Sequence, residues 1–288
     1  MSTSKNVAAS VRARLLTRAK EQAMDYNLIL TKYALERLLY RLGASQWADA
    51  FLLKGALLFD LWFDQPHRPT RDMDLLGFGS SDMADLVTVF RTVCALPHDD
   101  GMVFDPTTVR ATEIRREANY AGTRVTLLGV LDGARCAVQI DVGYGDAVTP
   151  EAERVRYPVL LADMAAPQIR AYPRYTVVAE KYQAMVSLGM VNTRLKDYFD
   201  VWFLTQHAPL DPAVLLQAIA ATFARRGTPL PQSLPMGLSD AFAKDPSKEK
   251  QGAPSLNKNK LQAPPLAVVT HELRQLLWEP TSPPHNRP

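Results

Sequence analysis

Two aspartates separated by one residue, Asp72 and Asp74, suggest chemistry more directly than any other pattern in this 288-residue chain. They open a run that predicts a β-strand, in which alternate side chains point to the same side. The two carboxylates therefore share one face, while Met73 and Leu75 point the other way into a core. Hard cations such as Mg²⁺ or Mn²⁺ take oxygen ligands, often one or two carboxylates together with substrate phosphates. The spacing predicts a divalent-cation site, although an exposed strand end or an Asx turn also produces it.

The segment before these aspartates predicts a turn that could bind phosphate. Phe51–Leu53 predicts a buried strand, Lys54-Gly55 a turn, and Ala56–Phe63 an apolar helix. A glycine turn that leads into a helix N-terminus presents free backbone N–H groups to a phosphate. If the strands on either side of this helix are neighbours, the turn and the two carboxylates lie at the same end of the unit. Lys54 has a second explanation, a solvated lysine at a strand end.

A third carboxylate, Asp141, could reach the same face. Residues 122–131 and 135–142 predict two strands, and the Asp132-Gly133 pair between them predicts a hairpin. In the second strand Asp141 lies on the side opposite Val138 and Ile140. It joins the two aspartates if its strand lies beside theirs. A plain turn initiator is the alternative.

Helical patterns account for much of the remaining chain. They cover residues 11–43, 82–94, 177–190, 192–205, 212–226 and 266–278. Residues 243–265 are rich in Lys, Asn, Pro, Gln and Ser, which predicts a flexible linker or a solvated loop. Its lysines, which begin with Lys244, could instead contact RNA phosphates. The tail from Thr281 is expected to be disordered.

Composition excludes several classes of protein. The formal net charge is only +3 with a pI near 8.8, which does not fit a protein that coats nucleic acid but permits an RNA substrate. The two cysteines, Cys94 and Cys136, form neither a disulfide framework nor a zinc pattern. The N-terminus lacks the apolar core of a signal peptide, and no stretch approaches the roughly 20 apolar residues needed to span a bilayer. We therefore expect a soluble cytoplasmic protein without a membrane partner.

The runs KGALLFDL and RPTRDMDL resemble the opening motif of the AbiEii-type nucleotidyltransferase toxins of type IV toxin–antitoxin pairs, which belong to the DNA polymerase β-like nucleotidyltransferase superfamily. In that family a Lys-Gly-Gly or Gly-Ser turn precedes a helix, and Arg-x-Ser/Thr-x-Asp-x-Asp follows. The matching residues here are Lys54, Gly55, Arg68, Thr70, Asp72 and Asp74. Ala56 departs from the pattern because the family usually has Gly or Ser there. It lacks a hydroxyl but keeps the backbone N–H.

The run EKYQAMVSLGMVNTRLKDYFDVWFL resembles the family's downstream signature, a Glu-Lys helix start followed by an Arg-x-x-Asp-x-x-Asp helix. The matching residues are Glu180, Lys181, Arg194, Asp197 and Asp200. The resemblance thus covers roughly residues 51–204. Taken alone, the Arg194–Asp197 and Lys196–Asp200 spacings are also typical of surface ion pairs on a helix.

The resemblance implies an α/β (α+β) fold with a polymerase β-like nucleotidyltransferase core and a small mixed sheet. This N-terminal domain, with its leading helices, would occupy residues 1–155, and a mostly helical C-terminal domain would occupy residues 156–288.

The resemblance also implies roles for the matching residues. Asp72, Asp74 and Asp141 would hold Mg²⁺ or Mn²⁺, and Asp141 could instead act as the base. Lys54, Gly55, Ala56, Arg68 and Thr70 would bind the nucleotide. Lys181 would neutralise the triphosphate, and Asp200 would contact substrate or orient Lys181.

The expected activity is transfer of a nucleoside monophosphate from an NTP to an acceptor, such as the 3′ end of a tRNA, in a toxin with a cognate antitoxin encoded nearby. Two alternatives stay open. One is a catalytically silent RNA- or protein-binding module of the same fold, which the Ala56 departure motivates. The other is a nucleotidyltransferase that modifies a protein hydroxyl.

Overall fold

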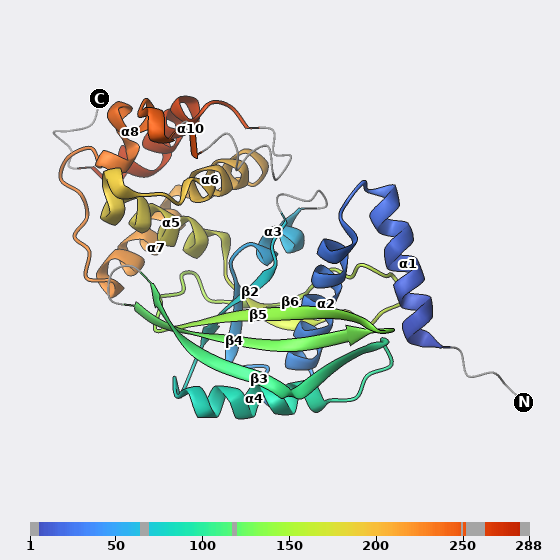
Figure 1. Ribbon diagram of the computed structural model, residues 1–288. Coiled ribbons are helices and arrows are strands. Elements are labelled where there is room, and N and C mark those ends of the chain that lie inside the picture. The colour runs from blue at the N-terminus through green and yellow to red at the C-terminus, as the bar shows by residue number, and fades with distance from the viewer. Residues whose placement is uncertain (1–5, 64–68, 117–119, 249, 252–262, 283–288) are drawn as a thin grey trace, which may run out of the picture. The chain divides into compact units, whose positions relative to one another are not determined.

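The chain folds into two compact units (Figure 1). The computed structural model describes residues 6–63, 69–116, 120–248, 250–251 and 263–282. The first unit is Met1–Gly145 with Glu153–Ala171, and the second is Asp146–Ala152 with Tyr172–Pro288. The sequence predicted a single division after residue 155. The units divide the chain differently because the strands at residues 153–156 and 168–171 join the sheet of the first unit, whereas residues 146–152 belong to the second.

A seven-stranded mixed sheet forms the first unit, in the order β3-β4-β5-β2-β1-β7-β6. This confirms the predicted mixed α/β class. The strands are β1 Phe51–Lys54, β2 Asp72–Gly77, β3 Met102–Arg116, β4 Tyr120–Leu131, β5 Ala134–Tyr144, β6 Glu153–Arg156 and β7 Gln168–Ala171. Strand β2 lies in the interior, antiparallel to β1 and parallel to β5.

The predicted strand–helix–strand segment is confirmed. Helix α3, Leu57–Trp62, connects β1 to β2. The predicted hairpin is confirmed as well, because β4 and β5 pair directly in antiparallel register. Asp132 and Gly133 have φ values of 46° and 76°. Two positive φ values in a row are the requirement of a type I′ turn, whose twist suits a two-residue hairpin.

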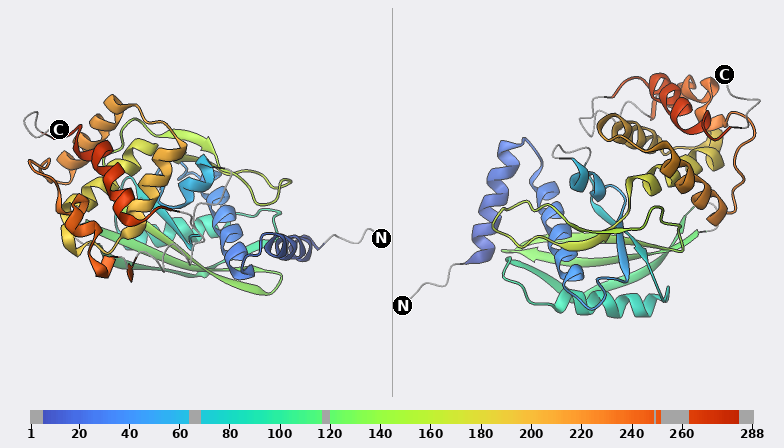
Figure 2. Two further views of the ribbon diagram at one scale, coloured as in Figure 1. Left: turned by 90° about the horizontal axis from the view of Figure 1, so that it is seen from above. Right: turned by 180° about the vertical axis from the view of Figure 1, so that it is seen from behind.

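Three further helices belong to the first unit: α1 Val7–Glu21, α2 Tyr26–Gly43 and α4 Met83–Ala95. The prediction of one helix over residues 11–43 was wrong. Ala23 takes a positive φ of 49°, and the Asp25 side chain accepts a hydrogen bond from the Leu28 backbone N–H, which starts a second helix. The α1 and α2 helices lie beside each other, and α4 runs along β3 (Figures 1 and 2).

Strands β3, β6 and β7 were not predicted. Strand β3 contains Pro106, and its pairing with β4 shifts between Asp105 and Arg110. A proline breaks the strand pattern in the sequence, yet an edge strand with a bulge tolerates it. Strand β6 reads Glu-Arg-Val-Arg and lies at the opposite edge. Such short, charged edge strands protect a sheet from pairing with other chains but leave no apolar signature.

Helices make up most of the second unit as the structure describes it, and the predicted helices there are confirmed with small shifts at their ends. The α-helices are α5 Arg174–Leu188, α6 Leu195–His207, α7 Pro212–Arg225, α8 Asp240–Ala243 and α10 Leu266–Leu273. Short 3₁₀ helices occupy Gly189–Val191 and Met236–Leu238, and a π-helix occupies Arg274–Trp278. Among the described residues, no helix has the length and apolar character that crossing a membrane requires.

The predicted flexible segment begins in ordered structure. Lys248 is buried, its Nζ donates to the Asn192 carbonyl oxygen at 2.9 Å, and it lies over the Phe242 ring. This lysine therefore packs within the second unit and is not solvated. Lys258 and Lys260 lie outside the described residues, as do residues 283–288 of the predicted disordered tail.

A buried ion pair joins α2 to the start of β3. The Arg41 guanidinium donates to both carboxylate oxygens of Asp100 at 2.7 and 3.1 Å, and both side chains are almost completely buried. Asp100 also accepts from the Met102 backbone N–H, and Arg41 donates to the Met102 carbonyl oxygen. Two charges can lie in a core at tolerable cost only when every polar atom is engaged in this way.

We predict that Asp100→Asn destabilises the protein by about 3–5 kcal/mol, because it leaves the Arg41 charge buried without its partner. Chemical denaturation monitored by circular dichroism measures this difference. Asp163→Asn is the matched control, since Asp163 makes an equally short pair with Arg14 but both side chains are exposed. An equal loss of stability in the two variants would contradict the prediction.

Candidate functional site

Strand pairing aligns four charged residues in one row across four neighbouring strands. Asp74 on β2 lies opposite Lys54 on β1 and opposite Asp141 on β5. Asp141 in turn lies opposite Arg124 on β4. Residues opposite each other on adjacent strands project to the same face about 4.8 Å apart. We call Lys54, Asp74, Asp141 and Arg124 the charged row.

The opposite face of these strands is apolar. Met73, Leu75, Ile140, Val142 and Val125 alternate with the charged residues and are completely buried. Their burial fixes which face the charged side chains take, because strand side chains alternate strictly. Asp72 lies two residues before Asp74 and therefore projects on the face of the charged row. The predicted shared face of Asp72, Asp74 and Asp141 is thus present in the structure.

Asp141 is held by an arginine that sequence reasoning missed. The Arg124 Nε donates to Asp141 Oδ1 at 2.8 Å, and Nη2 donates to Oδ2 at 2.9 Å. Asp141 is 6% exposed, whereas the Arg124 side chain is 38% exposed. Turned so that its carbonyl oxygen faces Arg124, the Gln139 amide accepts from the same two nitrogens at 3.3 and 3.1 Å. The two hydrogen bonds between Arg124 and Asp141 fix the orientation of the Asp141 carboxylate.

The aspartates act on Arg124 as a group. The hydrogen bond with Asp141 raises the pKa of Arg124 above its usual value, against an opposing effect of partial burial. The negative charges of Asp141, Asp72 and Asp74 raise this pKa further. Arg124 therefore stays a cation, and its field reaches all three carboxylates.

Asp72 is oriented by the loop before its strand. Thr70 Oγ1 donates to Asp72 Oδ1 at 2.5 Å, so the threonine orders a carboxylate oxygen. Asp72 also lies opposite Gln139 of β5. The predicted nucleotide-binding residue Arg68 lies outside the described residues.

Gly55 meets a steric requirement set by Asp74. Its φ is +74°, and a Cβ at this position would lie 2.1 Å from the Asp74 Oδ2 atom. Only glycine combines that backbone conformation with so close an approach. The turn backbone thus lies directly against the carboxylate, as the sequence reasoning expected from a turn and an aspartate at the same end of two paired strands.

The neighbours of Gly55 are less exposed than expected. Lys54 is 7% exposed, so its explanation as a solvated strand-end lysine was wrong. Ala56 is buried and occupies the N-cap of α3, where no side chain accepts a hydrogen bond. The backbone alone therefore forms this end of the helix.

In the second unit, Lys181 is bound by two buried aspartates. Its Nζ lies 2.5 Å from Asp197 Oδ1 and 2.9 Å from Asp200 Oδ2, and both aspartates are 1% exposed. Arg194 Nε pairs with Asp197 Oδ2 at 2.7 Å. Asp200 therefore orients Lys181 from α6 and is not part of a surface pair with Lys196.

Charge holds Asp197 in its ionised form. Burial alone would raise the pKa of Asp197, but the positive charges of Lys181 and Arg194 outweigh it, so this pKa lies below its ordinary value. Asp197 is thus a second partner of Lys181, beside the predicted Asp200.

A second polar cluster in this unit contains Glu180 of the family signature together with residues that sequence reasoning missed. The Arg226 guanidinium contacts Asp146 Oδ1 at 2.9 Å, Gln183 Oε1 at 2.9 Å and Glu180 Oε2 at 3.4 Å. The partners come from segments far apart in the sequence, so no local spacing indicates them. The cluster fastens the segment 146–152 to α5 and to the end of α7.

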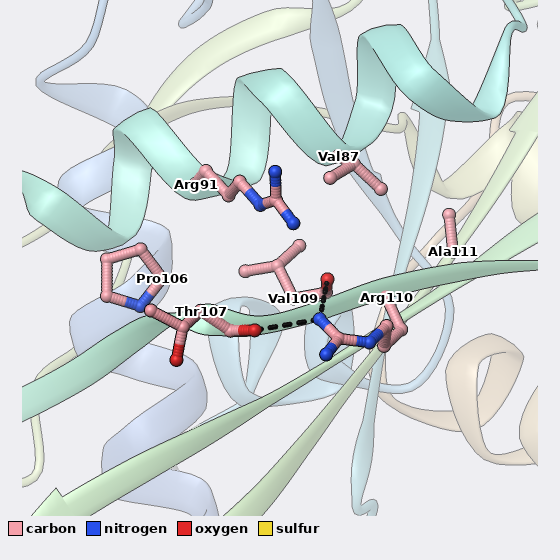
Figure 3. Close-up of a pocket in the computed structure, with 7 residues that line it drawn as sticks. All are labelled: Val87, Arg91, Pro106, Thr107, Val109, Arg110 and Ala111. Atoms are coloured by element: carbon pink, nitrogen blue, oxygen red, sulfur yellow. Dashed lines mark hydrogen bonds between the residues drawn. The ribbon is translucent and has the colours of Figure 1, made fainter.

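The charged row does not form a preformed metal cluster in the part of the chain that the structure describes. In the ranges that the structure describes, no three His, Cys, Asp or Glu side chains are grouped so that they could hold a metal ion. A surface pocket lies instead between α4 and β3, lined among others by Arg91, Thr107 and Arg110 (Figure 3). It shares no residue with the charged row.

Comparison with known proteins identifies the family. The family model described as the nucleotidyl transferase AbiEii toxin of type IV toxin–antitoxin systems matches residues 37–277. The chain belongs to this family. It is therefore a nucleotidyltransferase of the toxin type, and membership implies an NTP substrate and an antitoxin partner. A comparison with curated proteins gives no match.

Two solved structures from Helicobacter pylori are similar to this AbiEii-family chain. JHP933 is 15% identical, with 88% of this chain and 94% of that chain covered and a TM-score of 0.49. A second protein, which carries a provisional nucleotidyltransferase name, is 15% identical, with 88% and 98% covered and a TM-score of 0.50. At this identity the second likeness supports the fold alone.

We predict that Gly55→Ala disturbs the candidate site through Asp74. Gly133→Ala is the matched control, because Gly133 has a φ of +76° but no atom lies within 4 Å of the point that its Cβ would occupy. Both variants carry the strain of a left-handed alanine, while Gly55→Ala must also displace a carboxylate, at a further cost of about 1–3 kcal/mol. Thermal denaturation of the two variants and a nucleotide-transfer assay measure the difference. Equal stability and equal activity would show that the close approach has no consequence.

Proposed function

We propose that the face bearing Asp72 and the charged row binds a metal–NTP complex. A hydroxyl of RNA, such as that at the 3′ end of a tRNA, attacks the α-phosphorus, so that the nucleoside monophosphate is transferred to RNA and pyrophosphate is released. The observation that carries this proposal is the register that sets Asp74 beside Asp141 with Asp72 on the same face. Family membership supplies the reaction type. The acceptor is inferred from the resemblance described above and from a net charge that permits RNA. We place the reaction in the cytoplasm, where both substrates occur.

The donor set fits Mg²⁺ or Mn²⁺. Asp72 and Asp74 offer carboxylate oxygens from one face of β2, and Asp141 offers two more from the adjacent strand. These three residues would hold the cation, which when bound neutralises charge on the transferring phosphoryl group. In the described structure Asp141 forms an ion pair with Arg124, so it must leave this pair before both of its oxygens can bind the cation.

The remaining predicted residues are proposed to bind the nucleotide. Gly55 and Ala56 would present backbone N–H groups to the β- and γ-phosphates, and Thr70 would keep Asp72 oriented. Lys54 and Arg68 would add positive charge near the phosphates. Phosphoryl transfer depends mainly on positioning and charge neutralisation, so small shifts in these groups have large effects on rate.

Lys181 is proposed to neutralise the triphosphate, with Asp200 and Asp197 as the residues that position it. The carboxylates of Asp197 and Asp200 hold the Lys181 ammonium group in place, and they also balance its positive charge. In the alternative role, Asp141 would not bind the cation but, once released from Arg124, would serve as the base that accepts a proton from the acceptor hydroxyl.

We predict that Asp72→Asn and Asp74→Asn each lower nucleotide transfer by at least about 100-fold, because an amide cannot replace an anionic metal ligand. Transfer of label from each of the four NTPs to total tRNA, with and without Mg²⁺, measures the activity. Circular dichroism checks that the fold is intact. Asp105→Asn, on β3 of the same sheet, is the control. Full activity in both Asp72 and Asp74 variants, or activity that survives chelation, would remove this site assignment.

We predict that the label ends in RNA. Lysate incubated with protein and labelled NTP is split and treated with ribonuclease or with protease, and the label should be lost to ribonuclease only. Loss to protease alone would assign a protein hydroxyl as the acceptor. RNA binding without any transfer, and without need of metal or NTP, would favour the silent binding module.

A further inference from the structure

We propose that Arg124 is the internal counter-ion of the face that bears the carboxylates. It is a positioning residue that pairs with Asp141 while no divalent cation is bound. A cation that binds to Asp141 must displace Arg124 from this pair. This inference rests on the proposed metal–NTP site and concerns its regulation by a residue of the chain itself. It assigns Arg124 a role that opposes metal binding and at the same time stabilises the metal-free protein.

The geometry of the pair supports this role. Two nitrogens of one guanidinium face the two oxygens of one carboxylate at 2.8 and 2.9 Å. Such two-point pairs are among the strongest side-chain hydrogen bonds, and they cover the lone pairs that a cation would use. Asp141 is nearly buried, so its charge requires a partner in every state of the site. Arg124 is partly exposed and can move away from the sheet without leaving a buried charge of its own.

The charges of the row lead to the same conclusion. Lys54 and Arg124 at its ends carry the opposite charge to Asp74 and Asp141 between them, so the row sums to zero. Asp72 adds one negative charge two residues before Asp74. The positive charges at the ends of the row weaken the field that the carboxylates would exert on a divalent cation that approaches without nucleotide.

A nucleotide changes this balance. Its triphosphate offers Arg124 another anionic partner, for which a guanidinium fork is well suited. Once Arg124 turns from Asp141 to a phosphate, Asp141 becomes available to the cation. Metal and nucleotide are then coupled through one side chain, and the site resists occupation by free cations.

The test is a titration of the full-length protein with Mn²⁺ in the absence of nucleotide, followed by electron paramagnetic resonance. We expect Arg124→Gln to bind Mn²⁺ at least about tenfold more tightly than the wild type, because a unit charge a few ångströms from the ion is removed. Arg124→Lys keeps the positive charge and should stay within about threefold of the wild type, because the repulsion between this charge and the cation is retained.

Arg110→Gln is the control for a general loss of positive charge. Arg110 lies on the neighbouring strand β3, and its guanidinium donates to the backbone carbonyl oxygens of Thr107 and Val109, not to a carboxylate (Figure 3). This variant should bind Mn²⁺ as the wild type does.

A second readout covers the case in which Arg124→Gln folds poorly. In chelator its melting temperature should lie below that of the wild type, and Mn²⁺ should raise it by more than it raises the wild-type value. The double variant Arg124→Gln/Asp141→Asn should regain stability in chelator and lose the tight Mn²⁺ binding.

Equal or weaker Mn²⁺ binding by Arg124→Gln, with binding that Asp74→Asn abolishes, would overturn the counter-ion role and leave the proposed metal site standing. Absence of Mn²⁺ binding in both the wild type and Arg124→Gln, at concentrations that support transfer by other nucleotidyltransferases, would overturn the counter-ion role and the metal site together.

Discussion

The register of β2 between β1 and β5 is the constraint on which the candidate site depends. It sets Asp74 opposite Lys54 on one side and opposite Asp141 on the other. The apolar face enforces it, because a slip of one residue would turn Met73 and Leu75 outward and bury the aspartates. Hydrophobic burial on one side of the sheet thus determines the electrostatics on the other. The core of the first unit and the candidate site thus lie on opposite faces of the same strands.

Local patterns in the sequence were sufficient for the parts of this arrangement that are themselves local. The alternation around Asp72 and Asp74 gave their shared face, and the Asp132-Gly133 turn gave the hairpin that carries Asp141. Pairing between β2 and β5 could not be predicted from a local pattern, because the long strands β3 and β4 lie between them in the chain. Nothing near Arg124 indicates that its strand will set it opposite Asp141. An edge strand with a proline, such as β3, likewise leaves no regular pattern to read.

The second unit illustrates another limit of sequence reasoning. Spacings of three and four residues are the same for ion pairs on an exposed helix surface and for carboxylates on a buried face. Asp197 and Asp200 lie on the buried face of α6, where Lys181 from α5 and Arg194 at the start of α6 make two adjacent negative charges tolerable. The family signature marked these positions as important. It is the burial, which depends on how α5 and α6 pack, that explains why Lys181 has to be there.

The sheet is completed out of chain order, and this has a consequence for synthesis on the ribosome. Strand β1 is made early, but its parallel neighbour β7 follows only after β2, β3, β4, β5, residues 146–152 of the second unit and β6. Until β7 emerges, one hydrogen-bonding edge of β1, next to Lys54 and Gly55, has no partner strand. A nascent chain stopped before residue 171 would therefore expose an open β-edge, so folding of the region around the glycine turn has to wait for a late segment of the chain.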